Sequence, residues 1–248
     1  MAEALSDIAY RLITKKLMAS ELLAGQKISE QQIASACGIS RTPVREAVRR
    51  LTEEGVLYQI PSSGTYVAGM DRRQLIDSYE VRMALECFAL EHAVKNLTRE
   101  TRQELHRLCG EMHTIIRRLR SKKTKVLDGP PLVSFLSADL SFHLLILRTA
   151  GNSMAIKIVN NAYQRNQFFG HHSHRRDLTH LAWVWRHHAK IEQAIRRGEV
   201  GNARRWLRAH ITRSMTDALR AFDLSAAAQS EKSDPVDAAL ERLSNRLT

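Results

Sequence analysis

The chain has 248 residues, 44% of them hydrophobic and 26% charged, with only 11 Gly and 5 Pro. This composition excludes a disordered or collagen-like chain and is typical of a folded, helix-rich protein with room for two domains. The formal net charge of +12 suggests a polyanionic partner. Residues 1–70 nevertheless hold 8 basic and 7 acidic side chains, so the net charge by itself does not locate a nucleic-acid surface.

The cysteines and the N-terminal residues indicate the cellular compartment in which the protein works. The three cysteines, Cys37, Cys87 and Cys109, cannot all pair within one chain and none belongs to a C-x-x-C motif, so no disulfide framework is expected. The N-terminal stretch is amphipathic and carries acids, unlike a secretory leader, and no apolar run approaches the length of a membrane span. We therefore expect a cytoplasmic protein with no membrane partner.

The N-terminal part of the chain has the pattern of successive short helices. Apolar residues recur at helical spacing over residues 3–19. Ser29 is placed to cap a second helix, which Gly38 ends. Ser40 is placed to cap a third, because Pro43 then falls in the first turn, where a missing N–H costs nothing.

After the third helix the hydrophobic period changes. The runs VLYQI at 56–60 and TYV at 65–67 are β-prone, and Pro-Ser-Ser-Gly between them is a turn signal. Three helices followed by a β-hairpin form a winged helix-turn-helix. We expect this domain over residues 1–70.

From residue 71 onward the pattern is wholly helical. Helices are expected near 72–95, 98–120, 132–150, 152–169, 177–197 and 200–223. Polar residues placed to cap helices are Asp71, Thr98, Asn152 and Asp177. The short connections favour an all-α antiparallel bundle over residues 71–224, followed by a flexible tail at 225–248. The fold class is therefore mainly α.

The third helix carries Arg41, Thr42 and Arg45 near its start, away from its apolar stripe. Arginine offers a fork of donors to guanine edges or phosphates, and a hydroxyl can bind beside it. The alternative is a solvated helix face on which Arg45 and Arg49 pair with Glu46 and Glu53. Spacing alone does not decide between these interpretations.

Residues 22–67 resemble the winged helix of GntR-family transcriptional regulators, both in the run ISRTPVREAVRRLTEEGVL and in the glycine-containing wing. The resemblance implies that Arg41, Thr42 and Arg45 contact operator DNA. It also implies a phosphate contact for Ser40. It puts Gly64 at the tip of the wing, where a side chain would obstruct the approach to the minor groove.

Polar residues interrupt the apolar stripes of three bundle helices. Asp139 and His143 lie one turn apart on the stripe of their helix, so a carboxylate and an imidazole can bind one ion. His188 lies on the stripe of the next of these helices, with His187 about 100° away, and His210 lies on the stripe of the last. One cation would serve all four inward groups; alternatively, each histidine is a core residue with its own partner.

These segments, with Gly151-Asn152, also resemble the ligand-binding domain of the FadR subfamily, called the FCD domain. The resemblance implies a divalent metal held by Asp139, His143, His188 and His210, with open positions for a carboxylate effector. The family usually has Glu-His where this chain has His187-His188, so the choice of His188 depends on the stripe. Three imidazoles and one carboxylate suit zinc best, and also suit nickel or manganese.

Two further residues are candidates for effector contact. Arg82 matches an arginine that points into the effector cavity in many FCD relatives, where it would complement a carboxylate. The alternative is a pair with Glu80 or Glu86 along the same helix. Asn152 is expected to cap its helix and could approach the cavity. The histidines at 171–174 are expected in an exposed loop.

These features predict a ligand-responsive, sequence-specific transcriptional regulator that binds operator DNA and a small carboxylate effector. A homodimer is expected, because one winged helix reads one half-site. An alternative from another class is a metal-dependent hydrolase fused to a DNA-binding head. Against it, no inward Glu or Asp other than Asp139 is expected beside the three metal segments to act as general base, so no enzyme is expected. A third alternative is a basic protein that coats nucleic acid without sequence preference.

Overall fold

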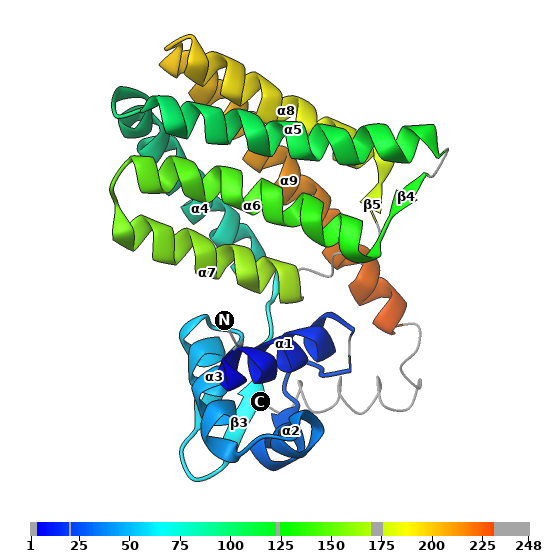
Figure 1. The fold of residues 1–248 in the computed structure, drawn as a ribbon. Coiled ribbons are helices and arrows are strands. Elements are labelled where there is room, and N and C mark those ends of the chain that lie inside the picture. The colour runs from blue at the N-terminus through cyan, green and yellow to red at the C-terminus, as the bar shows by residue number, and fades with distance from the viewer. Residues whose placement is uncertain (1–3, 20, 123–124, 170–175, 231–248) are drawn as a thin grey trace, which may run out of the picture.

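A computed structural model describes residues 4–19, 21–122, 125–169 and 176–230 of the chain. Figure 1 shows an N-terminal unit, here called the head, below a layered bundle of long helices. The head ends with the strand at Gly64–Val67, and the first bundle helix begins at Arg72. The expected domain boundary at residue 70 lies between the two.

The head contains three helices and a small antiparallel sheet. The helices are α1 (Leu5–Met18), α2 (Glu30–Cys37) and α3 (Arg41–Glu53). The strands are β1 (Lys27–Ile28), β2 (Leu57–Ile60) and β3 (Gly64–Val67). β3 is the central strand and pairs antiparallel with both others, so β2 and β3 form the predicted hairpin and β1 adds an edge that the sequence did not predict.

Local signals explain the helices of the head. The Ser29 hydroxyl accepts a hydrogen bond from the backbone N–H of Gln32, and Gly38 ends α2 with a φ of 66°. Ser40 occupies the N-cap position of α3 but makes no capping bond with its side chain. The buried stripe of α3 packs against α1 and α2 and consists of Val44, Ala47, Val48 and Leu51.

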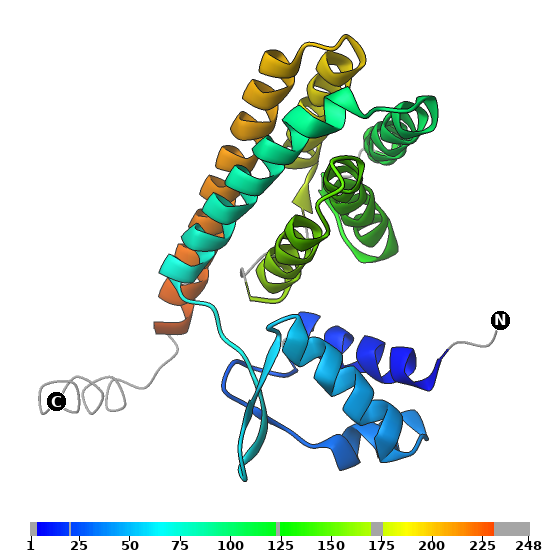
Figure 2. The same cartoon turned by 90° about the vertical axis from the view of Figure 1, so that its left-hand side faces the viewer.

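The bundle consists of six long helices in the described part of the chain. They are α4 (Arg72–Lys95), α5 (Arg99–Ser121), α6 (Gly129–Thr149), α7 (Ser153–Phe169), α8 (Leu178–Arg196) and α9 (Val200–Ser230). α4 packs along α9, as Figure 2 shows, and α5 packs against α6 and α8. A two-residue strand on each side, β4 (Val126–Leu127) and β5 (Arg176–Asp177), ties the start of α6 to the start of α8.

The four predicted bundle caps are confirmed. Asp71 forms a reciprocal capping box with Gln74, in which each side chain accepts a hydrogen bond from the backbone N–H of the other residue. Thr98, Asn152 and Asp177 each accept a hydrogen bond from the backbone N–H three residues on. These bonds fix where the long helices begin.

Three details differ from the sequence-based expectations. α6 begins at Gly129 rather than near residue 132, because two prolines are tolerated in a first helical turn. α9 continues to Ser230, beyond its expected end near residue 223, while residues 231–248 of the expected tail lie outside the described residues. The histidines at 171–174 also lie outside the described residues.

By length and composition alone, α6 is the one helix of the described chain that could cross a membrane. Half of its most apolar window is buried inside the protein, where it packs against α4, α5 and α7. Its buried face also carries Asp139 and His143. The apolar character of α6 is that of a central core helix.

Candidate functional site

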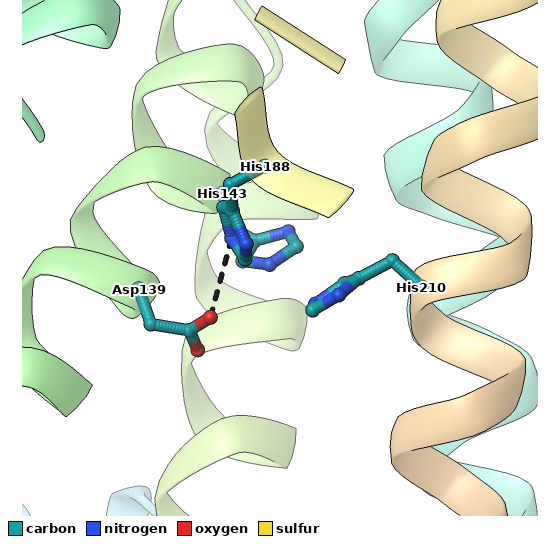
Figure 3. Close-up of side chains that lie close together, drawn as sticks. All are labelled: Asp139, His143, His188 and His210. Carbon is teal, nitrogen blue, oxygen red and sulfur yellow. Dashed lines mark ion pairs between the residues drawn. The ribbon is translucent and has the colours of Figure 1, made fainter. Parts of the chain in front are cut away.

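Three bundle helices bring four polar side chains together in the core. Asp139 and His143 come from α6, His188 from α8 and His210 from α9, and all four are buried. One ligand-type atom from each residue lies within 4.8 Å of all the others. Figure 3 shows the carboxylate and the three rings converging on one point.

Each member of this cluster has a buried polar atom with no hydrogen-bond partner among the described residues. These atoms are Asp139 Oδ1, His143 Nε2, His188 Nε2 and His210 Nδ1. A buried polar atom left without a partner destabilises the folded state, so unsatisfied atoms are rare in proteins. The set has the donor chemistry of a transition-metal site, and one cation among the four atoms would satisfy all of them.

Hydrogen bonds on the far sides of the rings fix which nitrogens face the centre. Val184 O lies 2.9 Å from His188 Nδ1, and since a carbonyl only accepts, Nδ1 carries the proton and Nε2 keeps its lone pair. In the same way Glu86 Oε2 lies 2.6 Å from His143 Nδ1, which leaves His143 Nε2 facing the centre. The Tyr163 hydroxyl donates to Asp139 Oδ2.

One contact inside the cluster joins two acceptors. Nε2 of His188 lies 3.2 Å from Oδ1 of Asp139, the dashed line of Figure 3. With the His188 proton on Nδ1, neither of these atoms has a hydrogen to donate. Two lone pairs at this distance in a buried site repel each other unless a positive charge lies between them.

The protonation states suit metal ligands. Burial lowers the pKa of His188 to about 4, although the Asp139 carboxylate opposes this shift. Burial, together with the neighbouring histidines, lowers the pKa of His210 well below its ordinary value. Both rings are therefore neutral at pH 7, which is the form that coordinates metal.

Glu86 of α4 is a site residue that sequence reasoning missed. It is buried, and Oε1 accepts from Arg82 Nε at 2.9 Å while Oε2 faces His143. Burial raises the pKa of Glu86, but its interactions with His143 and Arg82 outweigh burial and hold the pKa at about 2. The expectation of no inward acid besides Asp139 was wrong. The Arg82–Glu86 spacing was the available signal, but it is equally typical of a surface pair.

A cavity opens beside the cluster. Arg82, Asp139, Tyr163, Asn166 and His210 line it, and the space open to the centre of a water molecule is about 70 Å³. That is room for about five waters or for a small organic acid. Arg82 pairs with Glu86 and also lines the cavity, so the pair along the helix does not exclude a position at the cavity.

Two asparagines and one further histidine show which residues belong to this site. Asn166 is buried in the cavity wall, and its Nδ2 has no partner among the described residues. Asn152 caps α7 and is not among the residues that line the cavity, so the structure does not bring it to the expected effector position. His187 is partly exposed and lies between Trp183 and Trp206, outside the four-residue cluster.

The surface of α3 is built differently, from exposed charge. Arg41 and Arg45 both reach Glu30 Oε2 of α2, at 3.3 and 3.1 Å. Arg49 pairs with Glu53, as the solvated-face interpretation predicts, whereas Arg45 does not pair with Glu46. Exposed pairs of this kind contribute little to stability and exchange readily for phosphate contacts. Ser40 and Thr42 are exposed beside them.

The wing differs from expectation at Gly64. The tip consists of residues 61–63, and Gly64 is the first residue of β3, paired with Ile60. Its φ is +134°, and a Cβ there would lie 2.7 Å from Lys27 Cε. Lys27 Cε is near the end of a flexible side chain and can move away, so the backbone conformation is what accounts for this glycine within the head itself.

Comparison with known proteins identifies the two units. Residues 77–213 match the FCD domain, and residues 5–67 match the bacterial regulatory proteins of the gntR family. The chain belongs to the GntR family and carries an FCD domain. Its fold class, a winged helix-turn-helix followed by a helical domain, is that of this family.

Similar GntR regulators come from several bacteria. An HTH-type transcriptional regulator of Streptomyces ambofaciens is 27% identical over 82% of this chain and 80% of its own length. The gluconate operon transcriptional repressor of Bacillus subtilis is 29% identical over 62% of this chain and 58% of its own length. The solved structure of E. coli McbR/YncC shares the fold, with a TM-score of 0.70 at 19% identity over 89% of this chain and all of that one.

These families and relatives are transcriptional regulators and not enzymes. The protein is accordingly a transcriptional regulator. The hydrolase alternative is not supported, even though Glu86 supplies a buried carboxylate beside the histidine cluster.

Proposed function

We propose that this GntR regulator binds operator DNA through the head and that a divalent metal and a small carboxylate in the FCD domain control the binding. The observation that carries the proposal is the approach of two acceptors, His188 Nε2 and Asp139 Oδ1, to 3.2 Å in a buried site. A cation between them removes the repulsion, and the other two unpartnered atoms complete its ligands.

The metal would be held by Asp139, His143, His188 and His210. Three imidazoles and a carboxylate favour zinc, and nickel or manganese also fit this donor set. When bound, the ion would supply positive charge to which a carboxylate could coordinate. Glu86 holds the ring of His143, and the Val184 carbonyl holds the ring of His188, in the tautomer that directs Nε2 at the metal.

The effector is proposed to be a small carboxylate bound in the cavity beside the cluster. The Arg82 guanidinium and the unpartnered Nδ2 of Asn166 supply buried donors for its oxygens. One relative is named for a gluconate operon, and gluconate is a carboxylate. Asn152 has no place in this proposal, since it caps α7 away from the cavity lining.

The DNA contact is proposed for α3 and the wing. Arg41, Thr42 and Arg45 lie exposed at the start of α3, and the unused hydroxyl of Ser40 is available for a phosphate. Since one head reads one half-site, the protein is proposed to act as a cytoplasmic homodimer on a two-fold operator.

The metal proposal is tested by elemental analysis of the purified full-length protein. We expect one ion per chain, its loss in a His143→Ala, His210→Ala double variant, and its retention in His187→Ala. The same preparations are then offered a pool of random duplexes with nonspecific DNA as competitor. Recovery of one sequence family by the wild type supports operator recognition, whereas recovery without preference supports the nucleic-acid-coating alternative. A full complement of metal in the double variant contradicts the site.

A further inference from the structure

Helix α7 contacts the four-residue cluster in the bundle and the end of α3 in the head. It is the bundle helix that faces the head in Figures 1 and 2, and it packs against α4, α6 and α1. On one side of α7, Tyr163 donates to Asp139, and Asn166 accepts from Ser78 in the cavity wall. At 100° per residue, Asn161 and Arg165 project from the opposite side of the same helix.

The opposite side of α7 holds the end of α3. Asn161 Nδ2 donates to the backbone carbonyl of Glu53, the last residue of α3, at 3.2 Å. The last carbonyls of a helix have no partner within the helix, so this bond satisfies an otherwise open acceptor. The end of α3 is therefore tied to α7 by a bond from a side chain.

Arg165 contacts the turn that follows α3 and the segment that leads from the head into the bundle. Its Cδ lies 3.2 Å from the position that a Cβ on Gly55 would occupy, so the arginine stem lies against the glycine that follows α3. Its Nη2 reaches Gly69 O and Gln74 Oε1, each at 3.5 Å, in the segment that leads into α4. Gly55 has a φ of +71°, and any side chain there would both strain the backbone and displace Arg165.

This contact is incompletely satisfied. Arg165 Nε is buried and has no hydrogen-bond partner in the described part of the chain. Its bonds through Nη2 are long for hydrogen bonds to a guanidinium. A buried donor without a partner lowers the stability of the contact between α7 and the head relative to a fully bonded contact. A modest change on the other side of α7 can therefore alter this contact.

We propose that Asn161 and Arg165 are the positioning residues through which the FCD site sets the placement of α3. The inference rests on the proposed function. A metal ion in the cluster fixes the position of Asp139. The hydrogen bond between Tyr163 and Asp139 passes this constraint to Tyr163, and α7 moves with Tyr163. Asn161 and Arg165 transmit that shift to the end of α3. Because linkage is reciprocal, DNA bound to α3 changes the affinity for the metal by the same factor by which the metal changes the affinity for DNA.

The test measures backbone hydrogen exchange at the end of α3 in the full-length protein, with zinc as the probe. The amides of Glu54, Gly55 and Val56 donate within the turn that ends α3 and report its local opening. We expect that adding zinc to wild-type protein freed of metal by a chelator changes these exchange rates by at least about fivefold. Fivefold is about the lower end of the usual range of coupling between two sites.

Variants of α7 identify the route. In Asn161→Ala, Arg165→Ala we expect the zinc effect to fall below about twofold, clearly under the range of allosteric coupling, with one zinc still bound per chain. Asn161→Asp removes the donor without changing the size of the side chain and should have the same consequence. The matched control is Lys157→Ala, which removes a charge from an exposed position of α7 and should keep the wild-type response.

The outcomes separate this inference from the proposed function. A full zinc response in the double variant overturns the role of Asn161 and Arg165. Stoichiometric zinc without any change at α3 in the wild type also overturns it, while leaving the metal site intact. Failure of the wild type to bind zinc, seen by elemental analysis, contradicts the proposed function itself, and the inference falls with it.

Discussion

The head and the bundle each contain an Arg–Glu pair of nearly the same length. Arg45 lies 3.1 Å from Glu30 in the head, and Arg82 lies 2.9 Å from Glu86 in the bundle. The side chains of the first pair are 63% and 21% exposed, and those of the second 5% and 2%. Water solvates the first pair whether or not it forms, whereas each partner of the second depends on the other.

This difference in burial determines how strongly each region points to a ligand. An exposed arginine is inexpensive to maintain, so its position on α3 is compatible both with DNA contact and with a solvated surface. Buried polar atoms are costly, so the unpartnered set in the bundle core calls for a ligand. The comparison predicts that changes in the bundle alter stability and that changes on α3 alter DNA binding alone.

The largest expected effect is on the buried pair. Glu86→Gln leaves the charge of Arg82 unpaired in the core, and breaking one partner of a buried pair costs about 3 to 5 kcal/mol of unfolding free energy. Chemical denaturation measures it, and Glu30→Gln is the matched control from the head, expected to lose under about 1 kcal/mol. Equal losses in the two variants would remove the distinction between the regions.

The next effect is that of metal on stability. At a free zinc concentration a thousand times the dissociation constant, the folded state gains about 4 kcal/mol, so chelation should lower the melting temperature. His188→Ala should abolish this gain, while His187→Ala should retain it because that ring lies outside the cluster. A gain lost with His187→Ala and kept with His188→Ala would contradict the assignment.

A somewhat smaller effect is expected from pH in the metal-free protein. His188 has an unfolded pKa near 6.5 and a folded pKa of about 4, so between these values the unfolded chain takes up a proton that the folded chain excludes. The unfolding free energy should therefore fall by on the order of 3 kcal/mol between pH 6.5 and pH 4. Below about pH 4, His188 should contribute little further change. His188→Gln should flatten the profile measured by denaturation at each pH.

The smallest expected effect concerns DNA. Arg45→Ala should weaken binding to a selected operator by about 1 to 3 kcal/mol, the range for loss of a base contact. Its thermal stability should stay unchanged, since the exposed pair with Glu30 contributes at most about 1 kcal/mol. Arg73→Ala removes an equally exposed, paired charge from α4 and is the control in a titration at fixed salt. Identical affinities for both variants would exclude Arg45 from the DNA surface.

The sequence predicted the elements whose signals are local. The caps at Asp71, Thr98 and Asp177 depend on residues three positions apart, and so their bonds could be anticipated. The inward positions of His188 and His210 follow from the phase of an apolar stripe along one helix. The strands β1, β4 and β5 could not be anticipated, because each has two residues and forms only by pairing with a distant segment.

Glu86 and Gly64 show why the rest of the site was not predictable. Whether Arg82 and Glu86 face solvent or the core depends on the packing of α6 and α9 against α4, which no window of sequence contains. The place of Gly64 at the start of β3 depends on the pairing of that strand with β1 and β2. Both features depend on packing or pairing between separate segments of the chain.

The hydrogen bond from Tyr163 to Asp139 has a consequence for denticity. Oδ2 of this carboxylate is occupied by the phenol, and so Oδ1 alone faces the three histidines. An oxygen that already accepts a hydrogen bond is the weaker ligand, so the aspartate would bind an ion mainly through Oδ1. This disfavours calcium, an ion that gathers oxygens and often chelates a carboxylate through both. Tyr163 thus favours one kind of ion from outside the coordination sphere, and Tyr163→Phe should make binding through both oxygens easier.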